Sequence, residues 1–159
     1  NQREKKMINN DYLRGLRYIL DISDGKCCEL IQLSGEKVSI DQMKAYLKNE
    51  DEAGFIKCPD EIMAHFLDGL IFFKRGKDDS RPRLPFEFPI TNNIVLKKVK
   101  VAFALNEDDM HEVLSLAGFK VGRSELSAFL RKKGHENYRE CGDQFLRNFF
   151  KGLSLKFRA

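Results

Sequence analysis

The 159-residue chain has no tryptophan and contains only four cysteines and four prolines. It also lacks an unbroken apolar run of the roughly 18 residues that a transmembrane helix needs, so no membrane-spanning segment is expected. Its glycine and cysteine contents exclude collagen-like and disulfide-scaffold proteins. An apolar content of 42% is too high for a disordered chain. The composition therefore predicts one ordinary folded domain or two very small ones.

Motifs for catalysis and metal binding are equally scarce. The sequence has no zinc-type cysteine pair, phosphate-binding glycine loop, nucleophile elbow or metalloprotease helix motif. The histidines His65, His111 and His135 show no matching spacing to a nucleophile or to further ligands. We therefore expect no catalytic residue, no metal site and no cofactor, and we expect a binding protein rather than an enzyme.

The start of the chain shows no secretory signal, because no apolar segment follows its basic residues. A cytoplasmic location is expected, and four cysteines without paired spacing are typical of a reducing compartment. Residues 1–6 contain no apolar side chain and are expected to be a frayed tail or an expression-vector remnant.

What the chain does contain is an internal repeat. A shift of 83 positions places residues 7–75 on residues 90–158 without a gap, and sixteen of the 69 pairs are identical. The identical pairs include Gly35/Gly118, Ala45/Ala128 and Gly69/Gly152. A match of this length indicates a tandem duplication. The segment between the units, residues 76–89, holds three of the four prolines and predicts a semi-extended linker whose Phe86 and Phe88 dock on one of the units.

Each unit is predicted to fold into four short helices. Apolar residues recur at helical spacing, and no strand pattern of useful length occurs. Asn10 and Asn93 are possible N-caps of the first helix, and Ser39 with Gln42 forms a capping-box pattern that the second unit lacks. A repeated glycine inside the fourth helix, where glycine is costly, indicates a close helix crossing. The predicted fold is all-α, a tandem duplication of a four-helix unit.

Three stretches carry a resemblance to a known family: MINNDYLR (residues 7–14), ELSAFLRK (residues 125–132) and NYRECGDQFLRNFFKGL (residues 137–153). They resemble the YehS-like family, a bacterial family of unknown function, and the resemblance extends over nearly the whole chain from residue 7 to residue 158. It implies a bacterial cytoplasmic protein. It implies no reaction and no catalytic residue.

The second unit is the basic one. Residues 7–75 carry 9 basic and 12 acidic residues, whereas residues 90–158 carry 13 and 8. The second and third helices of this unit also resemble a helix-turn-helix, although the turn is about two residues longer than the tight form. A DNA- or RNA-binding surface is therefore one hypothesis. Its candidate contacts are Lys97, Lys98, Lys100, Lys120, Arg123, Arg131, Lys132 and Lys133.

A small-residue helix face favours a different class of function. With the apolar residues of the third helix turned inward, Ala128 is predicted to face outward beside Ser124 and Ser127, and Ala45 occupies the matching position in the first unit. Small side chains there would admit a partner helix or the other repeat. The alternative function is therefore a protein-interaction adaptor that uses these faces and the groove between the units. A solvated basic surface without a ligand is also compatible with the charge pattern.

Overall fold

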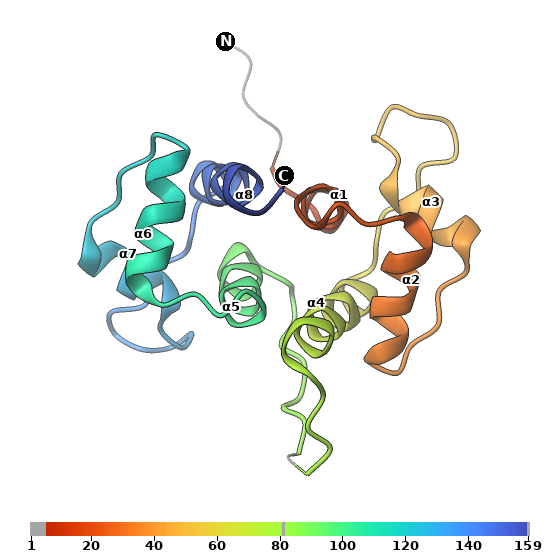
Figure 1. The fold of residues 1–159 in the computed structure, drawn as a ribbon, viewed down its shortest axis with the longest axis horizontal. Helices are drawn as coiled ribbons and strands as arrows, with labels where there is room; N and C mark the ends of the chain where they lie inside the picture. The colour runs from red at the N-terminus through yellow and green to blue at the C-terminus, as the bar shows by residue number, and fades with distance from the viewer. Residues whose placement is uncertain (1–5, 81, 159) are drawn as a thin grey trace.

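The computed structural model describes residues 6–80 and 82–158, and these residues form eight helices and no strand (Figure 1). The first unit contains α1 (Asn9–Leu20), α2 (Asp24–Leu33), α3 (Ile40–Leu47) and α4 (Asp60–Arg75). The second unit contains α5 (Asn92–Ala102), α6 (Glu107–Leu116), α7 (Arg123–Leu130) and α8 (Asp143–Phe157). The predicted all-α fold with a duplicated unit is confirmed.

Local sequence explains several helix starts. Ser39 caps α3, where its hydroxyl accepts from the Gln42 N–H at 3.1 Å and its own N–H donates to Gln42 Oε1 at 3.0 Å. The matching cap of α7 is Gly122, which has no capping side chain, as predicted. The prediction for Asn10 and Asn93 is wrong, because the N-caps of α1 and α5 are Ile8 and Thr91, two residues earlier.

The two units share one core. The longer helices α1, α4, α5 and α8 lie in the centre, with α2 and α3 on one side and α6 and α7 on the other (Figure 1). The units meet where α4 packs on α5 and where α1 packs on α8. Because the repeat relates α1 to α5 and α4 to α8, these are matching contacts made twice with the units exchanged. Apolar residues of both units therefore pack into one continuous cluster.

Gly69 and Gly152 mark the closest helix crossings. A Cβ on Gly69 of α4 would lie 1.8 Å from the carbonyl oxygen of Leu30 in α2. A Cβ on Gly152 of α8 would lie 2.0 Å from that of Val113 in α6. Only glycine allows the backbones to approach this closely. The repeated glycine is thus explained by packing, as the sequence indicated.

The linker between the units contains no helix in its described residues and returns along α4. Phe86 is half-buried, and its ring centroid lies 4.8 Å from that of His65 in α4. Phe88 is 55% exposed and contacts Phe86. Phe86 therefore docks on the first unit as predicted, whereas more than half of the Phe88 side chain is exposed.

Candidate functional site

A buried asparagine anchors the loop that follows the third helix of each unit. Asn93 Nδ2 donates to the carbonyl oxygens of Phe129 and Arg139, at 3.1 and 2.8 Å. Its Oδ1 accepts from the Cys141 N–H at 2.9 Å. Asn10 makes the same three bonds in the first unit, to Tyr46, Ile56 and Cys58. Both loops therefore have the same backbone supports, which explains why this asparagine and this cysteine recur.

The carbonyl groups at the end of α7 are occupied as well. Lys97 Nζ donates to the carbonyl oxygen of Arg131 at 2.7 Å, and the Arg139 N–H donates to that of Ala128 at 3.2 Å. In the first unit Arg14 Nη1 donates to the carbonyl oxygen of Lys48 at 2.6 Å. The recurring cation at positions 14 and 97 thus satisfies the C-terminal end of a helix. Lys97, a candidate nucleic-acid contact in the sequence, therefore also has a structural role within the chain.

Two further candidate cations form ion pairs within the chain. Lys98 Nζ lies 2.8 Å from Asp68, a buried carboxylate of the first unit, so this lysine joins the two units. Arg123 pairs with Asp108 at 3.1 Å, and both side chains are largely exposed. Lys100 is half-buried on α5, and Lys120 is exposed in the turn before α7.

The remaining candidates lie together in residues 131–139, which we call the basic loop. Arg131, Lys132 and Lys133 are exposed there, and the loop also contains an exposed Arg139 that the sequence interpretation left out. Lys97 and Lys133 line one depression beside Tyr138, and Arg131 and Arg139 line a neighbouring one. The tertiary structure therefore gathers four exposed cations and Lys97 at the end of α7. Three exposed glutamates lie nearby: Glu125, which lines the same depression as Arg131 and Arg139, Glu136 in the loop and Glu140 after it.

The small-residue face is not open to a partner. Ala45 and Ala128 are 9% and 6% exposed, because the loop that follows each helix folds back over it. The Ile56 N–H donates to the Ala45 carbonyl oxygen at 3.3 Å, as the Arg139 N–H does to Ala128. Ser124 is exposed and Ser127 half-buried at the edge of this loop. The predicted open face is therefore wrong, because the chain itself covers both alanines, although neither of them belongs to the main apolar cluster.

The helix pair α6 and α7 keeps the long connection seen in the sequence. Residues 117–122 separate the two helices, and Gly118, the second residue of this connection, has φ +71°. A helix-turn-helix has a turn of three to four residues. The groove between the units, which the sequence suggested as a docking site, is lined in part by the linker. Leu84 and Phe86 of the linker form one of its walls. The helix-turn-helix and groove interpretations stay predictions.

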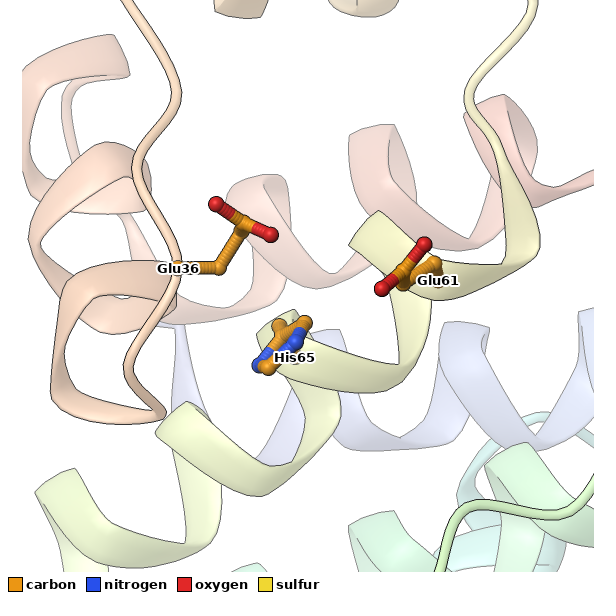
Figure 2. A group of neighbouring side chains, drawn as sticks. All are labelled: Glu36, Glu61 and His65. Carbon is orange, nitrogen blue, oxygen red and sulfur yellow. The ribbon is translucent and has the colours of Figure 1, made fainter.

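A second polar cluster lies on the first unit. Figure 2 shows Glu36, from the segment after α2, facing Glu61 and His65 on α4. One ligand-type atom of each lies within 4.8 Å of the others. His65 Nδ1 contacts the hydroxyl and the carbonyl oxygen of Ser34 at 2.8 and 3.2 Å. Ser34 is fully buried and also accepts from Arg83, at 2.9 Å to its carbonyl and 2.7 Å to its hydroxyl.

The sequence interpretation missed this cluster. Glu61 and His65 are one helical turn apart, which is a usable signal, but Glu36 comes from a separate segment 25 residues earlier. Only the packing of α2 on α4 brings it near them. The sequence-based expectation of no metal site does not account for three such side chains in one place.

These features define an all-helical protein built from two fused copies of one unit. The chain belongs to the DUF1456 family of proteins of unknown function, whose model matches residues 9–76 and again residues 92–159. It is 45% identical over 150 residues to the uncharacterized protein YehS of Escherichia coli (strain K12), covering 94% of this chain and 96% of that protein. The predicted family resemblance is confirmed. No solved structure matches the chain.

None of the helices formed by residues 6–80 and 82–158 is long and apolar enough to cross a membrane.

Proposed function

We propose that the protein binds the phosphate backbone of nucleic acid through the basic loop of its second unit. The observation that carries this proposal is the contrast between two loops with the same backbone supports. Residues 131–139 hold four basic residues and one acidic residue, whereas the matching residues 48–56 hold one basic and three acidic residues. Much of the charge difference between the two units lies in this one segment.

The two loops share their backbone hydrogen bonds but differ in their exposed side chains, so a comparison shows which residues folding requires. Asn10 and Asn93 hold the loops by matching bonds, and Cys58 and Cys141 are buried at matching places. Because the acidic loop folds on the same supports, the backbone arrangement does not require the four cations of the basic loop. Their concentration on one exposed segment favours an anionic ligand.

The end of α7 would by itself disfavour an anion, because the negative end of a helix dipole lies there. Three carbonyl groups at this end already accept a hydrogen bond. Arg131 accepts from Lys97, Phe129 from Asn93, and Ala128 from the Arg139 N–H. These donors offset the negative end of the dipole where the basic loop begins. A phosphate chain could then contact the loop cations where these three carbonyl groups already accept hydrogen bonds.

The proposal is tested by fluorescence anisotropy with mixed-sequence duplex DNA and single-stranded RNA at about 50 and 200 mM salt. The test variant is Lys132→Asn/Lys133→Glu, which introduces the residues found at the matching positions of the first unit, Asn49 and Glu50. We expect wild-type binding that weakens steeply with salt, and a loss of about tenfold or more in the variant at the lower salt.

The matched control is Lys37→Asn/Lys44→Glu, which changes the net charge equally at two exposed positions of the first unit. The control should bind within about twofold of the wild type, because a general charge effect is small beside lost phosphate contacts. Absence of binding at the lower salt, or an equal loss in both variants, would overturn the proposal. The adaptor hypothesis would then be the one to pursue.

A further inference from the structure

We infer that Glu36, Glu61 and His65 form a binding site for a divalent transition-metal ion of the zinc class. This site is separate from the basic loop and does not depend on the proposed nucleic-acid binding. The three side chains approach each other across the contact between α2 and α4, with one ligand-type atom of each within 4.8 Å of the others (Figure 2). Glu61 and His65 lie on one face of α4, one turn apart, and Glu36 faces them from the neighbouring segment.

The histidine is already held in an orientation that suits a metal ligand. Its Nδ1 contacts the carbonyl oxygen and hydroxyl of Ser34, and the Phe86 ring packs against the imidazole in a T-shaped arrangement at a centroid distance of 4.8 Å. A metal-binding imidazole commonly donates its second N–H to a carbonyl, which sets the tautomer and directs the ring. With Nδ1 engaged by Ser34, Nε2 is the nitrogen left for a metal ion.

Arg83 supports Ser34 from the linker, and a carboxylate offsets part of its positive charge. Its guanidinium donates to the carbonyl oxygen of Ser34 at 2.9 Å and pairs with Asp68 at 3.1 Å. Lys98 binds the other oxygen of the same carboxylate. Asp68 therefore offsets part of the positive charge of Arg83, and the orienting contacts continue from His65 through Ser34 into the linker.

The second unit serves as an internal comparison. There, Ala117, Phe119, Gln144 and Asn148 stand where the first unit has Ser34, Glu36, Glu61 and His65. Phe119 packs its ring on Phe145 at a centroid distance of 5.8 Å, so the second unit uses this place for apolar packing. Two helix pairs with the same crossing therefore differ in all three ligand-type residues and in the residue that orients the histidine. The fold does not require these polar groups at these positions.

The ligand set indicates the class of ion. One imidazole and two carboxylates suit zinc and its first-row neighbours, whereas calcium and magnesium prefer oxygen ligands alone. Two carboxylates also balance the charge of a divalent ion. Around a tetrahedral zinc ion, ligand atoms at about 2.1 Å from the metal lie about 3.4 Å apart. The long side chains of Glu36 and exposed Glu61 can close the distance from 4.8 Å by rotation.

The test is isothermal titration of ZnCl2 into the full chain after treatment with a chelator, with MgCl2 titrated in parallel. The variants are Glu61→Gln and His65→Asn, which introduce the residues that the second unit already carries at these positions. The matched control is His135→Asn/Glu136→Gln, which removes the same residue types from an exposed loop. Circular dichroism establishes that each variant keeps its helix content. All titrations are performed in a Cys28→Ser background, because Cys28 is the one cysteine not fully buried.

We expect one zinc ion bound by the wild type and by the control, and no measurable magnesium binding. Glu61→Gln and His65→Asn should each weaken zinc binding more than tenfold, and Ser34→Ala, which removes an orienting group, about tenfold. Zinc binding of equal strength in the wild type and in both ligand variants would overturn the inference. So would the absence of zinc binding by the wild type. If His65→Asn lowers the helix content, the result for Glu61→Gln decides.

Discussion

The backbone N–H of Met7 donates to the Asp143 carboxylate at 3.0 Å, across 136 positions of the chain. The matching bond joins the N–H of Ile90 to Asp60 at 3.3 Å. Each unit therefore uses the aspartate at the start of its last helix to hold the start of the other unit. Each aspartate also accepts a hydrogen bond from an asparagine of its own unit. Asn92 donates to Asp143 and Asn9 donates to Asp60, both at 2.7 Å. The duplication thus includes the contact between the copies.

We expect Asp143→Ala to lower the free energy of unfolding by about 2–4 kcal/mol, because it removes two hydrogen bonds to a charged, half-buried acceptor. Asp60→Ala should cost a similar amount for the same reason. Urea denaturation followed by circular dichroism measures both. Asp41→Ala, at an exposed position in α3, is the control and should change stability by less than about 0.5 kcal/mol. A cost for Asp143→Ala no larger than that of the control would contradict this assignment.

Replacement of the loop-anchoring asparagines should destabilise both units alike. Asn93→Ala leaves the carbonyl groups of Phe129 and Arg139 and the N–H of Cys141 without this partner. We expect a loss of about 2–4 kcal/mol, with Asn10→Ala within about 1 kcal/mol of it. Chemical denaturation of the two variants checks the prediction. Costs that differ severalfold would show that the matching bonds are not energetically equivalent.

The glycine crossings give a prediction with an internal control. Gly69→Ala should cost about 3 kcal/mol or more, since its Cβ would lie 1.8 Å from a backbone oxygen and helix α4 would have to move from α2. Gly25→Ala places a Cβ 3.9 Å from Ser23 Oγ, which is ordinary van der Waals contact, and should stabilise α2 by up to about 0.5 kcal/mol. Thermal unfolding of both variants distinguishes them. A mild effect of Gly69→Ala would mean that the crossing can relax.

The buried thiols predict a loss of stability at alkaline pH. Burial raises the pKa of Cys27, Cys58 and Cys141 to about 12, so the folded chain keeps protons that the unfolded chain loses from about pH 8.5 upward. The free energy of unfolding should therefore fall between pH 8.5 and 10, by at most about 1.4 kcal/mol per pH unit for each thiol.

Urea denaturation at pH 8, 9 and 10 checks this alkaline effect. Cys58→Ala/Cys141→Ala should show a shallower decline with pH than the wild type, whatever its stability at pH 8, because two of the titrating groups are gone. An unchanged slope would indicate that other groups cause the decline.

Sequence patterns predicted those features whose cause lies within one helix or one repeated position. Ser39 with Gln42 predicted a capping box because both partners lie in one turn. The sequence could not assign Asn10 or Lys97 correctly, because their partners lie 34 to 48 positions away along the chain. A separation of 29 positions along the chain likewise hid the cluster of Glu36 and His65.

The sequence by itself determined the eight helices, the duplication, the family and the excess positive charge of the second unit, because helical periodicity, repetition and composition are properties of the chain order. Only the tertiary structure decided which charged groups are available. The folding of each loop over its own helix buried Ala45 and Ala128, and it left four cations of residues 131–139 exposed. The packing of α2 on α4 brought Glu36 to His65. These outcomes depend on contacts between distant segments, which local propensity and charge counts do not contain.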